Sequence, residues 1–341
     1  MIYNKGVSMR NEAYEKGQRV GYFETTKMIT RLKKMPEYAY LKELDTVALY
    51  QTLKDLDQGF INFYQKRGRV PQYKKMHTGG MSYRTLNSHN RIRIEGKYIR
   101  IPKLGYLRIQ QSMEVGTIRN VAVEKTPTGK YFVALIVEFE PKKRRNMGDK
   151  IGIDVGIKDF YADSNGNIIK NPKYMEATMK KIVREQRRLS RKKEGSKNYE
   201  KQRRKLAGVH EKVVNQRNDF LQKQSTKIVL ENQMICIEDL QITEMLRKHW
   251  FSQGISSAAW SKFFKMLDYK SSWYGNQVIR VPTFYPSSQT CSACGYRNPL
   301  VKKLSVREWE CPNCHAKLSR DINAGLNILN KGLMMSAENK K

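Results

Sequence analysis

The sequence has 341 residues, with 65 Lys and Arg against 32 Asp and Glu, so its formal net charge at pH 7 is +33. This length accommodates two or three domains, and 39% hydrophobic residues exclude a wholly disordered chain. No apolar run approaches the roughly 18 residues of a membrane span. The N-terminus lacks the apolar core of a secretory signal, and five cysteines are too few for a disulfide scaffold. We therefore expect a cytoplasmic protein with no membrane partner.

The positive charge predicts a polyanionic partner, because a surplus of this size repels itself unless something neutralises it. Nucleic acid is the leading candidate, since its binding releases condensed counterions. A membrane surface is the competing partner, but neither end of the chain reads as a strongly amphipathic basic helix. A basic protein without a polyanionic partner is the third interpretation.

Two patterns follow one another in the first 146 residues. Residues 1–70 place apolar side chains at helical spacing, whereas residues 80–140 contain short alternating runs separated by Gly-containing turns. We predict helices in the first segment and a small β-barrel or sandwich in the second. The run 141–146 is predicted to be a solvated basic linker.

From residue 150 onward, predicted strands alternate with predicted helices, which indicates an α/β domain with a mixed sheet. A long helical pair over 173–232 is interrupted at Gly195-Ser196. Strands are expected at 151–155, 160–162, 168–169, 234–238 and 277–281, and helices at 256–275 and 320–331.

Four cysteines form two close pairs, Cys291-x2-Cys294 and Cys311-x2-Cys314, separated by sixteen residues. Each pair lies in a tight turn, and four thiolates complete the tetrahedral shell of one structural Zn2+ ion. Two disulfides or free thiols are the alternatives. His315 is predicted not to be a ligand, because the four cysteines already close the shell. Cys236 lies in an apolar strand and is predicted to be a core residue.

Three acidic residues lie in unusual contexts. Asp154 lies in an apolar strand between two glycines, Glu238 ends the run 234–237, and Asp321 opens the last helix. A carboxylate at the end of a buried strand is costly unless it is paired or bound to metal, and carboxylates are the ligands that Mg2+ prefers. Each also has a simpler explanation: a turn before Gly156, an arginine partner for Glu238, or a helix dipole for Asp321.

Basic residues repeat along the helical pair and could form a phosphate track, or simply the solvated face of a hairpin. Aromatic residues after it are predicted to be core rather than a stacking platform. The basic residues are Arg184, Arg187, Arg188 and Arg191, which share one helix face, and Lys192, Lys193, Lys201, Arg203, Arg204 and Lys205. The aromatic residues are Trp250, Phe251, Trp260, Phe263 and Phe264.

The order of these motifs resembles the TnpB (OrfB) family of IS200/IS605-type insertion sequences, which is related to the type V CRISPR nucleases. The similarity runs from about residue 80 to 331, with the cysteine module just ahead of the last carboxylate. Its segments are Gly152–Gly156, Asn215–Phe220, Ile237–Leu240, Leu267–Lys270, Phe284–Cys291 and Arg320–Ile328.

The resemblance implies a RuvC nuclease domain of RNase H-like fold that cuts double-stranded DNA selected by a guide RNA from the transposon end. Asp154, Glu238 and Asp321 match the family's three carboxylates, which hold two catalytic Mg2+ ions, and the four cysteines match its zinc ligands. Family members usually begin with a wedge-domain strand, whereas Met1–Asn4 reads as the entry to the first helix. A monomer is favoured.

The implied domains follow the chain in order. They are a helical recognition lobe (1–75), a β-rich wedge domain (76–142), the RuvC domain with a basic helical insertion (150–290), the zinc ribbon (291–314), the C-terminal RuvC helix (315–331) and a tail (332–341). The two rival functions are a nuclease-inactive, RNA-guided DNA-binding regulator and a transposase that itself joins DNA strands.

Overall fold

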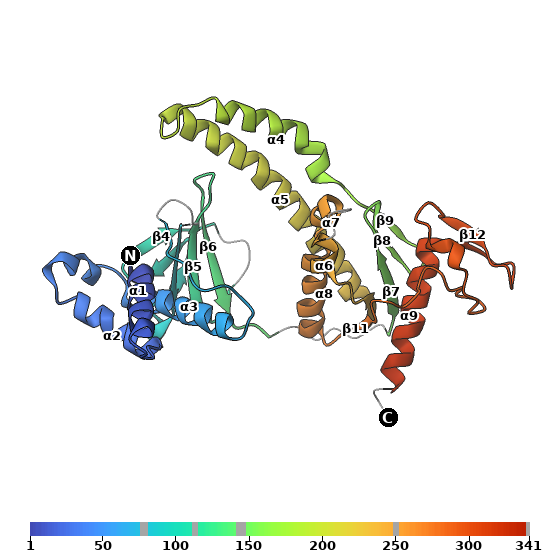
Figure 1. Cartoon of the computed structure of the whole chain (residues 1–341), viewed down its shortest axis with the longest axis horizontal. Coiled ribbons are helices and arrows are strands. Elements are labelled where there is room, and N and C mark those ends of the chain that lie inside the picture. Colours follow the sequence, from blue (N-terminus) through green and yellow to red (C-terminus); the bar gives the residue numbers. More distant parts are fainter. Residues whose placement is uncertain (76–80, 111–114, 141–147, 248–251, 339–341) are drawn as a thin grey trace. The chain divides into compact units, whose positions relative to one another are not determined.

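The structure, a computed structural model, describes residues 1–75, 81–110, 115–140, 148–247 and 252–338 (Figure 1). The chain divides into two compact units, Met1–Glu140 and Pro141–Lys341. The predicted basic linker and the aromatic residues Trp250 and Phe251 lie outside the described residues. No described helix is both long enough and apolar enough to cross a membrane.

The first unit begins with the predicted helices. They are α1 (Ile2–Glu15), α2 (Tyr22–Leu32), the 3-10 helix η1 (Pro36–Lys42) and α3 (Thr46–Tyr64). Leu53 and Leu56 on α3 are fully buried beside Ile29 of α2, as the helical spacing of apolar residues predicts. The Asp45 carboxylate caps α3 by accepting a hydrogen bond from the Val47 amide at 3.0 Å.

Six short strands complete the first unit, and they form two antiparallel sheets of three strands. One sheet has the order β1 (Met81–Leu86), β5 (Ile118–Lys125), β6 (Tyr131–Val137), and the other has the order β2 (Arg93–Glu95), β3 (Tyr98–Ile101), β4 (Gly105–Arg108). Asp45 also accepts hydrogen bonds from Tyr83 and Thr85 of β1, which connects the helices to the first sheet. The predicted change from helices to strands is confirmed.

A five-stranded mixed sheet is the centre of the second unit, as the alternation of elements predicts. Its order is β11 (Gln277–Val281), β10 (Met234–Glu238), β7 (Lys150–Val155), β8 (Asp159–Asp163), β9 (Ile168–Lys170). Strand β10 runs parallel to both β11 and β7, whereas β8 and β9 continue antiparallel. The carboxyl ends of β7, β10 and β11 therefore meet at one edge.

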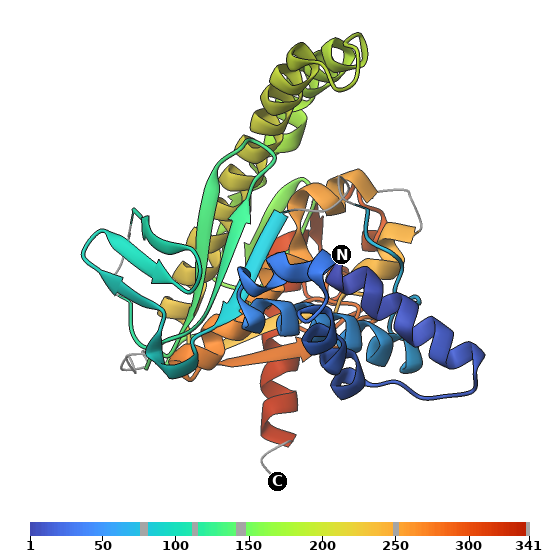
Figure 2. The ribbon, with the colours of Figure 1, turned by 90° about the vertical axis from the view of Figure 1, so that its left-hand side faces the viewer.

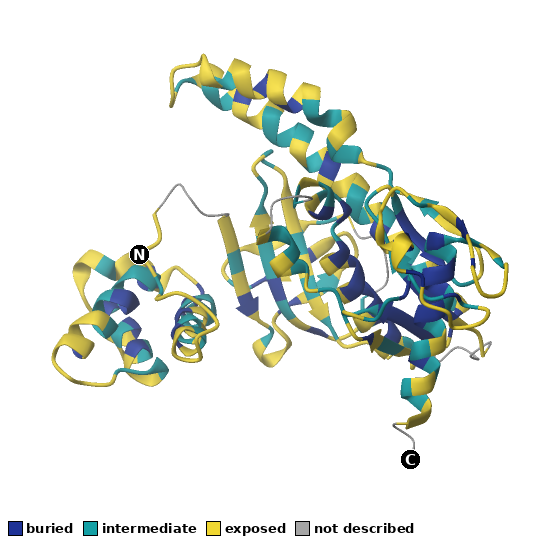
Figure 3. Ribbon diagram, turned by 45° about the vertical axis from the view of Figure 1, so that its right-hand side comes forward, coloured by how far each residue is buried: buried dark blue, intermediate teal, exposed yellow. Residues whose placement is uncertain are grey.

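Alternate residues of β10 face opposite layers of helices. Ile235 and Ile237 belong to the core under α5 (Lys197–Glu231) and α8 (Trp260–Tyr274), whereas Met234 and Cys236 pack on α9 (Arg320–Glu338). Cys236 is fully buried, as predicted, and burial raises the pKa of its thiol to about 11. Figure 3 shows the buried residues concentrated in this sheet and the helices around it.

The predicted helical pair consists of α4 (Tyr174–Ser190) and α5, which pack side by side and extend beyond the sheet (Figures 1 and 2). Gln202 is buried between them and donates hydrogen bonds to the Glu185 carbonyl at 3.1 Å and its carboxylate at 2.8 Å. Short helices α6 (Ile242–Arg247) and α7 (Ser252–Ala258) precede α8. The core prediction for Trp260, Phe263 and Phe264 is confirmed.

The last helix is longer than predicted, because α9 continues to Glu338 instead of ending near residue 331. The predicted tail covers 332–341, and its first residue is a glycine, which is unfavourable within a helix. In the fold, Gly332 packs on β10, where an added Cβ would lie 2.3 Å from the Cys236 sulfur. Contact with the sheet therefore overrides the local preference.

Candidate functional site

Two of the three predicted carboxylates lie on adjacent parallel strands. Ile237 of β10 is paired with Ile153 of β7, so the next residues, Glu238 and Asp154, are neighbours at the carboxyl edge of the sheet. Asp154 lies two residues after Gly152 on β7, and Glu238 lies two residues after Cys236 on β10. Residues two apart in a strand point to the same side, and Gly152 and Cys236 face α9. The strand register therefore places both carboxylates on the same face of the sheet.

Helix α9 brings Asp321 to that same face. The helix crosses β7 so closely that a Cβ at Gly152 would lie 2.1 Å from the Gly325 carbonyl oxygen. Asp321 is one turn before Gly325, in the first turn of α9. The structure thus brings the predicted carboxylates of three distant segments toward one edge of the sheet.

The three carboxylates interact electrostatically. Burial raises the pKa of Asp154 well above its ordinary value, and the negative charges of Glu238 and Asp321 raise it further. Burial also raises the pKa of Glu238, although the Ser287 hydroxyl lowers it by donating a hydrogen bond to Oε1 at 3.0 Å. This accumulation of negative charge fits an oxygen-ligated divalent cation such as Mg2+.

Two arginines that sequence reasoning did not identify lie beside the carboxylates. Arg307 contacts both carboxylate oxygens of Asp321, at 3.0 and 3.3 Å, and its charge and that of Arg320 lower the pKa of Asp154. Arg320 is 9% exposed, and its Nε has no hydrogen-bond partner in the described part of the chain. The site therefore combines three anions with two cations.

Two asparagines on α9 hold the loop that carries Ser287. Asn323 donates to the Thr290 carbonyl at 2.7 Å, and Asn327, one turn later, donates to the Ser287 carbonyl at 2.8 Å. Both asparagines are buried. Polar residues at i and i+4 on the apolar face of a helix are the signal that could have identified them.

The simpler explanations fail for Asp154 and Glu238, whereas the one for Asp321 agrees with its position. Asp154 lies within strand β7 and is paired with Ala162, so it is not a turn residue. Glu238 contacts Ser287, and no ion pair with an arginine is found for it among the described residues. Asp321 does lie in the first turn of α9, but it also pairs with Arg307.

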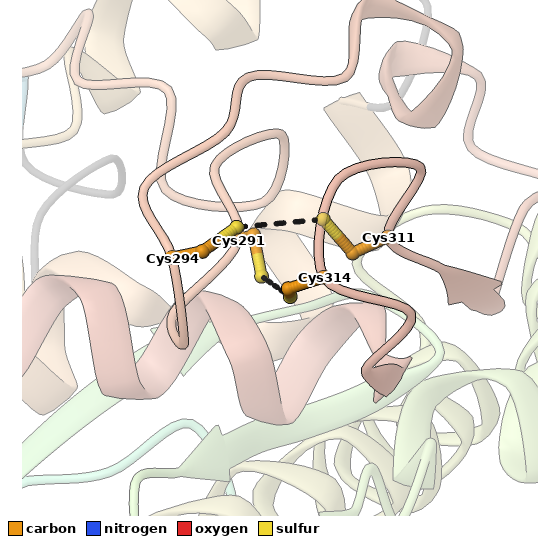
Figure 4. Close-up of side chains that lie close together, drawn as sticks. All are labelled: Cys291, Cys294, Cys311 and Cys314. Atoms are coloured by element: carbon orange, nitrogen blue, oxygen red, sulfur yellow. Dashed lines mark hydrogen bonds between the residues drawn. The ribbon is translucent and has the colours of Figure 1, made fainter.

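The four predicted cysteines converge on one point (Figure 4). Their sulfur atoms all lie within 4.8 Å of one another, with Cys291 3.7 Å from Cys314 and Cys294 3.6 Å from Cys311. Among the described residues this is the only group of three or more His, Cys, Asp or Glu side chains close enough to share one ion, so the carboxylate oxygens of Asp154, Glu238 and Asp321 do not all lie that close to one another. None of the four cysteines forms a disulfide in the structure, and the convergence of their sulfur atoms fits a closed thiolate site for zinc.

Each cysteine pair lies in the same type of backbone turn. The Gly295 amide donates to the Cys291 carbonyl and the His315 amide donates to the Cys311 carbonyl, both at 2.9 Å. Hydrogen bonds from the Asn313 side chain and then the Tyr296 amide lower the pKa of the Cys294 thiol, whereas hydrogen bonding to the other cysteines raises the pKa of the Cys314 thiol. Cys294 is therefore the one of these two thiols that more readily becomes a thiolate, the form that binds metal.

The basic residues of the helical pair divide into paired and unpaired cations. Arg184 and Arg188 pair with Glu185, at 3.3 and 3.1 Å, and Arg203 pairs with Glu200 at 2.8 Å. For the other predicted residues of this surface, no ion pair is found in the described chain. These residues are Arg187, Arg191, Lys192, Lys193, Lys201, Arg204 and Lys205.

A groove of about 590 Å³ lies between α4 and α5. Lys181 and Arg188 of α4, with Lys205 and Lys212 of α5, contribute cations to its walls, and Gly208 leaves open space there. Within each helix the two cations are seven residues apart, or about 10.5 Å. The groove can therefore offer two positions for anions along its length.

Comparison with protein families identifies two regions of the chain. The OrfB_IS605 family, described as "Probable transposase", matches residues 121–249. The TNB domain of Cas12f1-like proteins matches residues 260–328, which include the cysteine module.

Two curated proteins resemble nearly the whole chain. One from Streptomyces pristinaespiralis is 36% identical over 99% of this chain and 84% of its own length. InsQ of Escherichia coli (strain K12) is 30% identical over 97% of this chain and 86% of its own length. Both are named "Putative RNA-guided DNA endonuclease".

A chain of the cryo-EM structure of the Cas12f1–sgRNA–target DNA complex has a similar fold. The TM-score is 0.57 at 18% sequence identity, and the match covers 96% of this chain and 80% of that chain. At this identity the likeness concerns the fold alone.

Proposed function

Because this chain belongs to the TnpB (OrfB) family of IS200/IS605-type insertion sequences, we propose that it is an RNA-guided DNA endonuclease. Asp154, Glu238 and Asp321 are its catalytic residues in this proposal. The observation that carries it is their shared position on the α9 face of the sheet edge, where the charges of Glu238 and Asp321 raise the pKa of Asp154.

The three carboxylates would hold two Mg2+ ions. When bound, such ions activate water for attack on a phosphodiester and stabilise the leaving oxygen. The donor set supports this assignment, because it consists of carboxylate oxygens that repel one another without a cation.

The other residues of the site would orient the carboxylates and the substrate. Ser287 fixes the rotamer of Glu238, and its loop is held by Asn323 and Asn327. Arg307 is paired with Asp321 in this structure, so it would exchange that partner for a DNA phosphate when metal occupies the carboxylate. Arg320 supplies a second buried cation near Asp154.

The helical pair would bind nucleic-acid backbone. Residues 174–217 contain fifteen Lys and Arg against five acidic residues, and the groove between the helices is lined by four of these cations. Cations of this kind position a phosphate backbone without reading its sequence. In an RNA-guided enzyme, base pairing with the guide selects the target.

The partners in this proposal are a guide RNA from the transposon end and double-stranded target DNA. The helices of residues 1–75 and the strands of 76–142 would serve as recognition lobe and wedge, and the zinc ribbon would hold Arg307 beside the carboxylates. Such an enzyme would act as a monomer at the nucleoid in the prokaryotic cytoplasm.

Plasmid cleavage tests the proposal. The chain, coexpressed with the transposon end, should copurify with a discrete transcript from that end and cut a matching plasmid when Mg2+ is present. Asp154→Ala should reduce cleavage by at least roughly 100-fold while RNA binding is retained. Asp55→Ala, at an exposed position on α3 that pairs with Arg84 and lies outside the family segments, is the matched control and should cleave normally.

The same assay separates the rival functions. A nuclease-inactive regulator would bind the matching plasmid without cutting it, although all three carboxylates are present in this chain. A strand-joining transposase would yield joined products. Either result, or copurified RNA with no enrichment for one transcript, would contradict the proposal.

A further inference from the structure

Phe284 is the most exposed large hydrophobic side chain in the described residues, at 96%. It follows β11 and lies three residues before Ser287, the hydrogen-bond partner of Glu238. Single exposed apolar residues are common on protein surfaces. Phe284 differs from them because the backbone on both sides of it is held by hydrogen bonds, beside the sheet edge where the strands that carry Asp154 and Glu238 end.

The backbone around Phe284 is held on both sides. The Tyr285 amide donates to the Pro282 carbonyl at 3.0 Å, which places Phe284 in a tight turn. Thr283, just before it, donates to the Asp239 carbonyl. Tyr285, just after it, packs against the core under α9. The same fixed turn thus partly buries the Tyr285 side chain and exposes its neighbour Phe284.

The anchors connect this turn to the candidate active site. Asp239 directly follows Glu238, and the Asp239 amide donates to the Val281 carbonyl at 2.9 Å. Phe284 therefore lies between two contacts, at Asp239 and at Glu238 itself, just beyond the end of β11. Ligands of open α/β sheets bind beyond the carboxyl ends of their strands.

We propose that Phe284 is a stacking platform for a base of the DNA strand that is cut at the carboxylate site. This inference rests on the proposed function. A fixed aromatic ring stacks on any base, because every base has a π-face, so the contact would hold the strand in position without selecting a sequence. Arg307 and Arg320, whose charges act on Asp154, would neutralise phosphates of the same strand at the carboxylate site.

Fluorescence and cleavage test this role together. In EDTA, DNA carrying 2-aminopurine at successive positions of the cut strand should show stacking-dependent quenching at one position in complex with guide-loaded protein. Phe284→Ala should abolish that quenching. With Mg2+, the same substitution should slow single-turnover cleavage of the bound target by roughly 5- to 100-fold.

Three variants distinguish stacking from other effects. Phe284→Trp should retain quenching and cleavage, whereas Phe284→Leu, which keeps apolar bulk without a ring, should lose the quenching. Met334→Ala removes another exposed apolar side chain, 60% exposed on α9, and should cleave as the wild type does. All variants should show the wild-type melting temperature.

The outcomes separate this inference from the proposed function. If the wild type cuts its target and Phe284→Ala cuts at the same rate with unchanged quenching, the stacking role is wrong. If the wild type does not cut, the nuclease proposal fails. In that case the EDTA fluorescence still decides whether Phe284 stacks on the bound strand.

Discussion

The residue that directly follows each cysteine pair has a positive backbone φ angle. Gly295 and His315 occupy equivalent places and have φ angles of 77° and 56°, in the left-handed region. The His315 ring is 78% exposed and its Nδ1 lies 3.2 Å from Glu310. His315 therefore contributes its backbone amide to the turn, while its ring lies outside the cluster of four sulfur atoms.

His315→Gly should retain one zinc per chain and raise the free energy of unfolding by about 1 kcal/mol, because glycine adopts this dihedral without strain. His315→Val should lower it, since a β-branched residue is strained there. Metal analysis and thermal unfolding measure both effects. Cys314→Ser is the control that should lose zinc. Zinc loss in His315→Gly would show that the ring is a ligand.

The electrostatics of Asp154 oppose stability in the absence of metal. Its folded-state pKa is raised, chiefly by burial, so its contribution to stability is present below its ordinary pKa and is lost as pH rises through the folded-state pKa. Above the ordinary pKa of an aspartate, this buried carboxyl group therefore destabilises the folded state.

Asp154→Asn should consequently be more stable than the wild type in EDTA at pH 8, and the difference should disappear toward pH 3. Mg2+ should stabilise the wild type more than Asp154→Asn. Urea unfolding at both pH values measures these effects, with Asp219→Asn as a control that changes little. An Asp154→Asn variant that is less stable at pH 8 would contradict the electrostatic account.

At the scale of elements, close packing of α9 on the sheet positions the site. Gly152 allows β7 to approach the α9 backbone, and Gly325 allows α9 to approach the backbone of Asp163 and Ser164. Backbone atoms cannot move aside as flexible side chains can. A side chain at either glycine would therefore separate Asp321 from the strand carboxylates.

Gly152→Ala should reduce the free energy of unfolding by roughly 2–3 kcal/mol, because its Cβ would lie 2.6 Å from the Leu329 amide nitrogen. Gly208→Ala, within α5, is the matched control. Its Cβ would meet nothing within 4 Å, so it should stabilise the protein by about 0.5–1 kcal/mol. Equal effects at both positions in urea unfolding would contradict this packing argument.

For the whole molecule, the +33 charge predicts binding that weakens steeply with salt. The Lys and Arg side chains are not equally free to bind phosphates, because some of them already pair with acidic residues. In the groove between α4 and α5, no ion pair is found among the described residues for Lys181, Lys205 or Lys212. These cations should supply more of the salt dependence than paired cations elsewhere.

Changing Lys181, Lys205 and Lys212 to Gln should reduce the slope of log affinity against log salt by about 2 for single-stranded RNA. The control set removes three cations that already have partners and should change the slope less. It comprises Lys170, Lys173 and Lys223. Fluorescence anisotropy titrations at several salt concentrations measure both sets. Equal slope changes would show that only net charge matters.

Local features could be predicted from the sequence. The cysteine pairs, the helical hairpin and the alternation of strands and helices depend on spacing within short segments, where hydrogen bonding and apolar periodicity act between near neighbours. The three carboxylates were also recognisable by their contexts, because a charge in an apolar strand needs an explanation.

The tertiary structure decided what surrounds those carboxylates. Arg307 reaches Asp321 from the four-cysteine module, and Ser287 reaches Glu238 from a loop held by α9. Neither contact leaves a periodic signal, because each joins segments whose meeting depends on how α9 packs across the sheet. The continuation of α9 past Gly332 has the same cause. Short-range spacing determined the ligands and elements, and long-range packing determined their partners.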